Sequence, residues 1–230
     1  MFNFYHLVNR GVEQRTLFLD THDYARFVHD LFEFNDTAPA PPFARRNVGL
    51  TMSNIVPSHT RKQIVDIHAW CLMKNHYHLL VSERVENGIS HFLRKLNIGY
   101  AKYFNEKYQR NGTLFQGRTK KILIEHDAQF NYILHYIHLN PLDYLKGAEQ
   151  WRIRSKKKCI ASVEMAVKYL DEYRWSSYQD YCGKKNFPSV VLMEFFRKTY
   201  PDYSKEIRRY LHGAMVNTGD VQGSAVLGLE

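Results

Sequence analysis

Apolar and polar positions along the chain follow either a two-residue or a helical period, and the changes of period predict the successive elements. Strands are predicted at residues 4–11, 63–73, 76–83 and within 112–126, and residues 63–73 show the two-residue period of a half-buried strand. Helical spacing of apolar residues occurs at residues 20–34 and 88–108. Asp20 or Thr21 is the expected N-cap of the first of these helices.

The predicted order is strand, helix, strand, strand, helix, strand, with a further helix over residues 127–141. We expect Asp127 to cap this last helix and Pro141 to stop it. The order is that of a ferredoxin-like βαββαβ unit, an α+β fold with an antiparallel sheet and helices on one face. Lys74 and Asn75 predict a tight turn, and the ferredoxin-like order places the strand over residues 76–83 in the centre of the sheet.

The remaining sequence divides into a loop, an extension and a tail. Residues 35–62 are rich in Pro, Asn, Ser and Arg, and such a long loop is usually functional or disordered. We therefore predict a first domain over residues 1–146 with this insertion. A basic, helical extension follows over residues 147–216, and residues 217–230 form a flexible tail.

Charge and cysteine content restrict the class of protein. The formal net charge of +9 favours a polyanionic partner, most often nucleic acid, although some soluble proteins are merely basic. Cys71, Cys159 and Cys182 lack CxxC spacing, so neither a disulfide framework nor a zinc knuckle is indicated. No signal peptide or membrane-length apolar run is found. These features predict a cytoplasmic protein with no membrane association.

The stretch KNHYHLLV places two histidines at the start of an apolar strand. His76 and His78 are two residues apart, so both side chains point to the same face of the sheet, with Tyr77 on the other. Two imidazoles on one face can form half of a metal site. They can also be two ordinary histidines at the rim of a sheet, and their spacing alone does not decide between these interpretations.

The helix over residues 127–141 carries a polar stripe beside its apolar one. Tyr132, Tyr136 and Asn140 are spaced four residues apart and therefore share a face. Taken alone, this stripe is equally typical of a helix surface. If the helix packs over the histidine strand, Asn140 offers a carbonyl oxygen as a ligand, and the mixed nitrogen and oxygen ligands would suit Mg²⁺ or Mn²⁺.

Four motifs in fixed order carry a resemblance to a known family. NHYHLLV, GTLFQGRTK, YIHLNP and YRWSSY resemble those of the HUH single-tyrosine transposases, and most closely those of the REP-associated tyrosine transposases of bacteria. The resemblance implies a nucleoid-associated enzyme that nicks and rejoins single-stranded DNA next to hairpins. It also implies that His76, His78 and Asn140 hold a divalent metal, and that Tyr136 rather than Tyr132 is the nucleophile.

The same resemblance suggests DNA contacts, each with a structural alternative. The strand after the long helix carries basic residues that either contact phosphates or form a solvated edge. A second basic run is either a solvated loop or a backbone contact, and two aromatic residues either stack on bases or pack in the core. The candidates are Arg118, Lys120, Lys121, Arg152, Arg154, Lys157, Trp175 and Tyr178.

Several questions stay open from sequence. The separation between NPLDY and YRWSSY, residues 147–172, is longer than the resemblance leads us to expect. His135 and His138 are near Tyr136 in sequence, and neither is identified as a general base. The protein is either a monomer or a homodimer. Alternative functions are a nucleic-acid-binding regulator on the same fold, or a metal-dependent phosphodiesterase that uses water.

Overall fold

The computed structural model describes residues 3–39, 60–148, 151 and 162–213. Its centre is a four-stranded sheet in the order β2-β3-β1-β4. The strands are β1 (Phe4–Arg10), β2 (Val65–Met73), β3 (His76–Glu83) and β4 (Lys120–Leu123). Every neighbouring pair is antiparallel. The ferredoxin-like order and the central place of the histidine strand are therefore confirmed.

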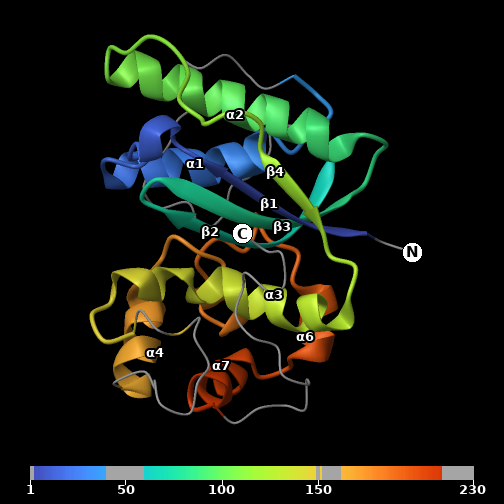
Figure 1. Cartoon of the computed structure of the whole chain (residues 1–230). Coiled ribbons are helices and arrows are strands. Elements are labelled where there is room, and N and C mark those ends of the chain that lie inside the picture. The colour runs from blue at the N-terminus through green and yellow to red at the C-terminus, as the bar shows by residue number, and fades with distance from the viewer. Residues whose placement is uncertain (1–2, 40–59, 149–150, 152–161, 214–230) are drawn as a thin grey trace.

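Two helical layers enclose the sheet (Figure 1). Helices α1 (Thr21–Glu33) and α2 (Gly88–Lys107) lie on one face, as the ferredoxin-like unit requires. Helix α3 (Asp127–Leu139) and the C-terminal helices cover the other face. The smaller helical elements are η1 (Val12–Gln14), η3 (Asn140–Tyr144), α4 (Val163–Glu172), α5 (Tyr178–Tyr181), α6 (Glu194–Thr199) and α7 (Tyr203–Leu211).

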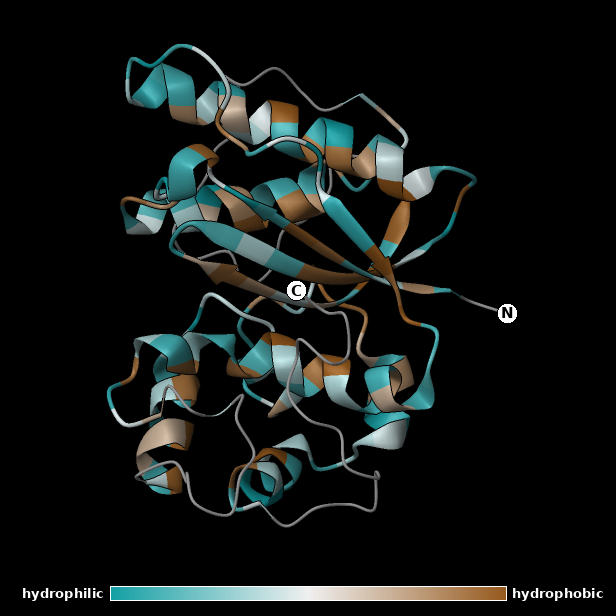
Figure 2. Ribbon diagram, viewed as in Figure 1, coloured by the Kyte–Doolittle hydropathy of each residue, from teal (hydrophilic) through white to brown (hydrophobic). Residues whose placement is uncertain are grey.

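The hydrophobic core lies on both sides of the sheet (Figure 2). Helix α2 buries Phe92, Leu96 and Tyr100, the apolar stripe that its sequence predicts. Burial of such large side chains is the main driving force for packing α2 against the sheet. The apolar strands β2 and β3 are buried along nearly their whole length because helices cover both faces.

Capping residues explain where the helices begin. Asp20 is the N-cap of α1, and its side chain accepts a hydrogen bond from the backbone N–H of Asp23. The prediction for α3 is wrong by one residue, since the N-cap is His126 and Asp127 is the first helical residue. The side chain of Gln129 accepts from the backbone N–H of His126. Asp127 instead places its negative charge in the first turn, where it interacts favourably with the positive end of the helix dipole.

The YRWSSY segment of the C-terminal extension pairs with the edge of the sheet. The backbone N–H of Leu72 donates to the carbonyl of Trp175 (2.9 Å), and that of Ser177 donates to the carbonyl of Trp70 (3.0 Å). These bonds cover the outer edge of β2, which would otherwise present unpaired backbone groups. The described part of the extension therefore packs on the same core as the sheet.

Candidate functional site

The histidines of β3 both face helix α3. His78 lies opposite Val8 and His76 opposite Arg10 in the antiparallel pairing with β1. Asn75 fixes the orientation of His76, because its amide oxygen lies 2.7 Å from His76 Nδ1. An amide oxygen only accepts hydrogen bonds, so Nδ1 carries the proton and Nε2 has the lone pair that a metal requires.

A third histidine, His6 of β1, belongs to the same cluster. It is not among the site residues that the sequence predicts. Its Nε2 lies 2.9 Å from His78 Nδ1, and the two rings are stacked with centroids 5.2 Å apart. The alternation in FYHLVNR places His6 on the same face as Val8. Which strand lies beside β3 depends on the sheet order, so the two-residue period alone could not bring His6 and His78 together.

Helix α3 supplies the opposite wall of the site. The Tyr136 ring lies edge-on to those of His78 and His6, with both centroid distances 5.6 Å. The amide nitrogen of Asn140 donates to the carbonyl of Tyr136, which fixes the amide at the end of the helix. Tyr132 stacks on Tyr210 of α7, 6.0 Å away. Of the two tyrosines, Tyr136 contacts the histidines and Tyr132 packs against the C-terminal helix.

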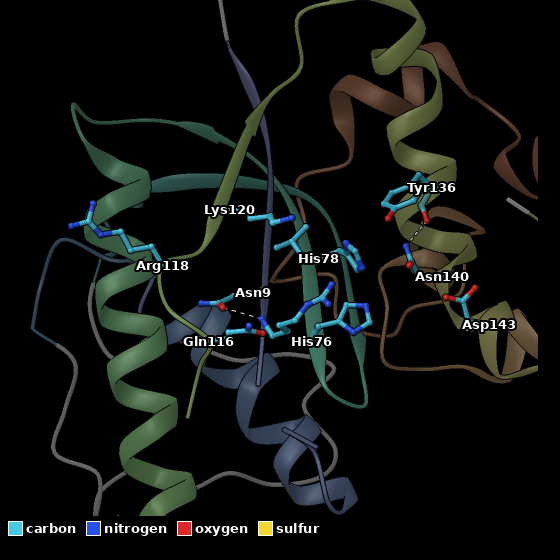
Figure 3. Close-up of a pocket in the computed structure, with 11 residues that line it drawn as sticks. Asn9, His76, His78, Gln116, Arg118, Lys120, Tyr136, Asn140 and Asp143 are labelled. Atoms are coloured by element: carbon cyan, nitrogen blue, oxygen red, sulfur yellow. Dashed lines mark hydrogen bonds between the residues drawn. The ribbon is translucent and has the colours of Figure 1, made fainter. Parts of the chain in front are cut away.

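A cavity of about 490 Å³ lies between the sheet and α3. In Figure 3 the imidazoles of His76 and His78 face the wall that carries Tyr136 and Asn140. This volume is in the usual range of a ligand site. The lining residues are Val8, Asn9, Arg10, His76, His78, Gln116, Arg118, Lys120, Tyr136, Asn140 and Asp143.

The basic residues of the GTLFQGRTKK stretch divide between the two faces of the sheet. Arg118 and Lys120 line the cavity. Lys120 pairs with Val8, which shares the face of His78, whereas Lys121 pairs with Leu7 on the other face. Lys121 Nζ lies 3.7 Å from Glu83 and 4.1 Å from the centre of the Tyr5 ring. Arg118 and Lys120 are thus the basic residues of this stretch at the cavity.

A hydrogen-bond network holds the loop that carries Arg118. Thr119 Oγ1 accepts from Asn9 Nδ2 (3.0 Å) and Asn97 Nδ2 (3.1 Å), and it lies 3.4 Å from the hydroxyl of Tyr77. Gly117 has a φ of +67°, a conformation that favours glycine. The loop is therefore tied to β1, β3 and α2, which fixes its position relative to the histidines.

The other predicted DNA contacts lie elsewhere. Trp175 is half-buried and stacks on Tyr24, with centroids 4.9 Å apart. Tyr178 has no exposed surface and packs against His138, so we do not retain it as a base-stacking residue. The three basic residues of the extension that were predicted to contact DNA lie outside the described residues: Arg152, Arg154 and Lys157.

Neither histidine beside Tyr136 in sequence faces the cavity. His138 is fully buried and is hydrogen-bonded at 2.9 Å to the hydroxyl of Tyr203 and at 2.8 Å to that of Ser177. His135 Nε2 lies 3.6 Å from Glu206. Both imidazoles attach α3 to the C-terminal segment, so their role is structural and neither is placed as a general base.

Two buried histidines are expected to make the protein acid-sensitive. Burial lowers the pKa of His138 well below its usual 6.5 and that of His68 to about 4. As the pH falls, these histidines are therefore protonated in the unfolded chain before they are protonated in the folded protein. Their contribution to stability is complete above pH 6.5 and is lost as the pH falls towards their pKa values in the folded protein. His68 alone should cost about 1.6 kcal/mol of unfolding free energy between pH 6.5 and 5.

Urea unfolding of the wild type and of His68→Gln at pH 7 and pH 5 measures this effect. The variant should lose less stability on acidification than the wild type does, because glutamine does not titrate. An equal loss in both proteins would contradict the assignment of the effect to His68.

The donor atoms at the cavity fit a divalent cation. Among the residues that the structure describes, no group of three or more His, Cys, Asp or Glu side chains forms a metal site. The donor set predicted from the sequence is two imidazoles and the amide oxygen of Asn140, whose amide nitrogen is already hydrogen-bonded to the helix. Nitrogen and oxygen ligands of this kind suit Mn²⁺ or Mg²⁺.

A protein-family model and a solved structure are similar to this chain. Residues 42–140 match the protein-family model described as "Transposase IS200 like". A solved structure of a REP-associated tyrosine transposase bound to a REP hairpin is 14% identical and has a TM-score of 0.45. The alignment covers 83% of this chain and 84% of that chain. No curated protein was found to match the sequence. Within the described part of the chain, every helix is too short or too polar to cross a bilayer.

Proposed function

We propose that this chain, whose residues 42–140 match the family model of IS200-like transposases, nicks and rejoins single-stranded DNA next to hairpins. The observation that carries the proposal is the contact between the rings of Tyr136 and His78. Both residues line a cavity that is also lined by Arg118 and Lys120. A nucleophile, a pair of metal-binding imidazoles and basic side chains are what phosphodiester transfer requires.

The Tyr136 hydroxyl would attack the scissile phosphorus. The phenol loses its proton as its oxygen forms a bond to phosphorus, the bond to the 3′ oxygen breaks, and the leaving oxygen gains a proton to become a 3′-OH. The product is a phosphotyrosine at the DNA 5′ end. Because the energy of the broken bond is retained, attack by another 3′-OH can release the tyrosine and join strands without ATP.

His76, His78 and Asn140 would hold the divalent cation, Mg²⁺ or Mn²⁺. When bound, the cation offsets the negative charge of the phosphate and the charge that develops in the transition state. Arg118 and Lys120 would hold the DNA backbone against the same wall. Trp175 and the basic run of the extension stay candidates for contacts with the flanking DNA.

A denaturing gel tests the proposal directly. The protein is incubated with hairpin-bearing single-stranded DNA and Mn²⁺, and a slow-migrating covalent adduct that disappears with EDTA is expected. Tight binding without cleavage would instead favour a regulatory protein. Cleavage that yields a free 5′ phosphate without an adduct would favour a phosphodiesterase that uses water.

Neutralising Arg118 and Lys120 at the cavity should weaken DNA binding in a salt-dependent way. In the double variant Arg118→Gln/Lys120→Gln, the slope of log K against log salt should fall by about 0.7 for each lost phosphate contact with single strands. Fluorescence anisotropy titrations at several salt concentrations measure the slope. Lys121→Gln is the matched control, since its side chain lies on the other face of the sheet. An unchanged slope in the double variant would contradict the proposed phosphate contacts.

A further inference from the structure

We infer that His6 is a positioning residue that fixes the tautomer of His78, so that Nδ1 carries the proton and Nε2 carries the lone pair. The inference rests on the proposed metal site and adds a residue that neither the sequence motifs nor the proposed ligand set contains. In this role His6 contacts neither DNA nor metal. Its effect on the proposed ligand is exerted through the hydrogen bond to His78.

The geometry joins His6 to a single nitrogen of His78. The distance from His6 Nε2 to His78 Nδ1 is 2.9 Å, and the interplanar angle of the two rings is 9°. His6 is fully buried and His78 is 4% exposed, so water has little access to compete for this bond. A buried hydrogen bond of this length restrains both ring orientation and proton position.

Only one placement of the proton suits a metal ligand. If His78 Nδ1–H donates to His6 Nε2, then His78 Nε2 has a lone pair for coordination. If His6 donates instead, His78 Nε2 bears the proton and cannot bind a cation. Metal-binding histidines commonly donate their second N–H to a neighbouring acceptor, which sets the tautomer and raises the basicity of the ligand.

The second ligand shows the same arrangement with a different acceptor. His76 Nδ1 donates to the side-chain oxygen of Asn75 at 2.7 Å. Both imidazoles of β3 therefore have a partner at Nδ1, which directs Nε2 to the site in each case. For His76 the partner is adjacent in sequence, whereas for His78 it comes from the neighbouring strand β1.

His68 provides a matched comparison within the same sheet. It is a buried imidazole on β2 whose Nε2 lies 2.8 Å from the hydroxyl of Ser82. Its ring packs against Phe4 and Phe196 rather than against the cavity. Replacing His68 removes one buried imidazole hydrogen bond without touching the proposed site.

Calorimetric titration of the DNA-free protein with Mn²⁺ tests the inference through binding alone. His6→Leu should bind Mn²⁺ about 10- to 100-fold more weakly than the wild type. His6→Gln should retain most of the affinity, because its amide oxygen can accept near the position of Nε2. His68→Leu should bind as the wild type does. Equal affinities of His6→Leu and the wild type would overturn the positioning role.

The tautomer is read directly from nitrogen-15 correlation spectra of metal-free wild-type protein, with His78→Ala used to assign the ring. We expect a proton on Nδ1 of His78. A proton on Nε2 would overturn the inference even if the His6 variants did not fold. Failure of the wild type to bind Mn²⁺ would overturn the proposed metal site itself, a result distinct from normal binding by both the wild type and His6→Leu.

Discussion

Tyr136→Phe is expected to form no covalent adduct with DNA. The substitution removes one hydroxyl and keeps the ring that packs against His78 and His6, so the fold and the DNA affinity should be retained. Without the phenol oxygen the proposed nucleophile is missing, and the step that forms the phosphotyrosine cannot occur. Denaturing gels should show the adduct with the wild type and none with the variant, even at long incubation times.

Tyr132→Phe is the control for this result. Tyr132 lies one helical turn earlier and stacks on Tyr210, so its loss should leave adduct formation within a few-fold of the wild type. Equal thermal unfolding and DNA binding in both variants would show that neither is misfolded. An adduct that survives Tyr136→Phe and is lost in Tyr132→Phe would move the nucleophile by one turn.

His78→Ala should lower the rate of cleavage by at least about 10²- to 10³-fold, the usual cost of removing a main electrostatic stabiliser of a transition state. The residual rate should no longer respond to EDTA, because one of the two imidazole ligands is missing. Single-turnover cleavage of hairpin-bearing DNA with and without EDTA measures both effects. His91→Ala is the control, since His91 is an exposed histidine on α2, on the other side of the sheet.

Mixing His78→Ala with Tyr136→Phe distinguishes a site built in one chain from a shared one. In the structure the histidines and Tyr136 of a single chain contact one another. The mixture should therefore remain inactive. Recovery of a substantial part of the wild-type rate would indicate that two chains exchange the helix that carries Tyr136, and that the active form is a dimer.

The parts of the site that follow from local periodicity could be predicted from the sequence. The two-residue period places His76 and His78 on one face of a strand, and the helical period places Tyr136 and Asn140 on one face of a helix. The order of elements predicts the ferredoxin-like sheet with the histidine strand at its centre. The structure brings the two pairs together because α3 packs on the histidine face of the sheet.

The parts that depend on contacts distant in sequence could not be predicted. His6 is 72 residues from His78, and only the sheet order makes them neighbours. Tyr178 looks like a stacking residue in sequence, yet the C-terminal helices bury it completely. The opposite orientations of Lys120 and Lys121, by contrast, follow from strand alternation alone.

We propose above all that Tyr136 attacks DNA at the site of His76 and His78. Peptide mapping of the wild-type adduct tests this most directly. The adduct formed on single-stranded DNA is digested with nuclease and protease, and mass spectrometry locates the residue that retains the nucleotide. The account predicts a 5′-phosphate linked to Tyr136. A linkage to Tyr132, to a residue outside α3, or to a DNA 3′ end would contradict it.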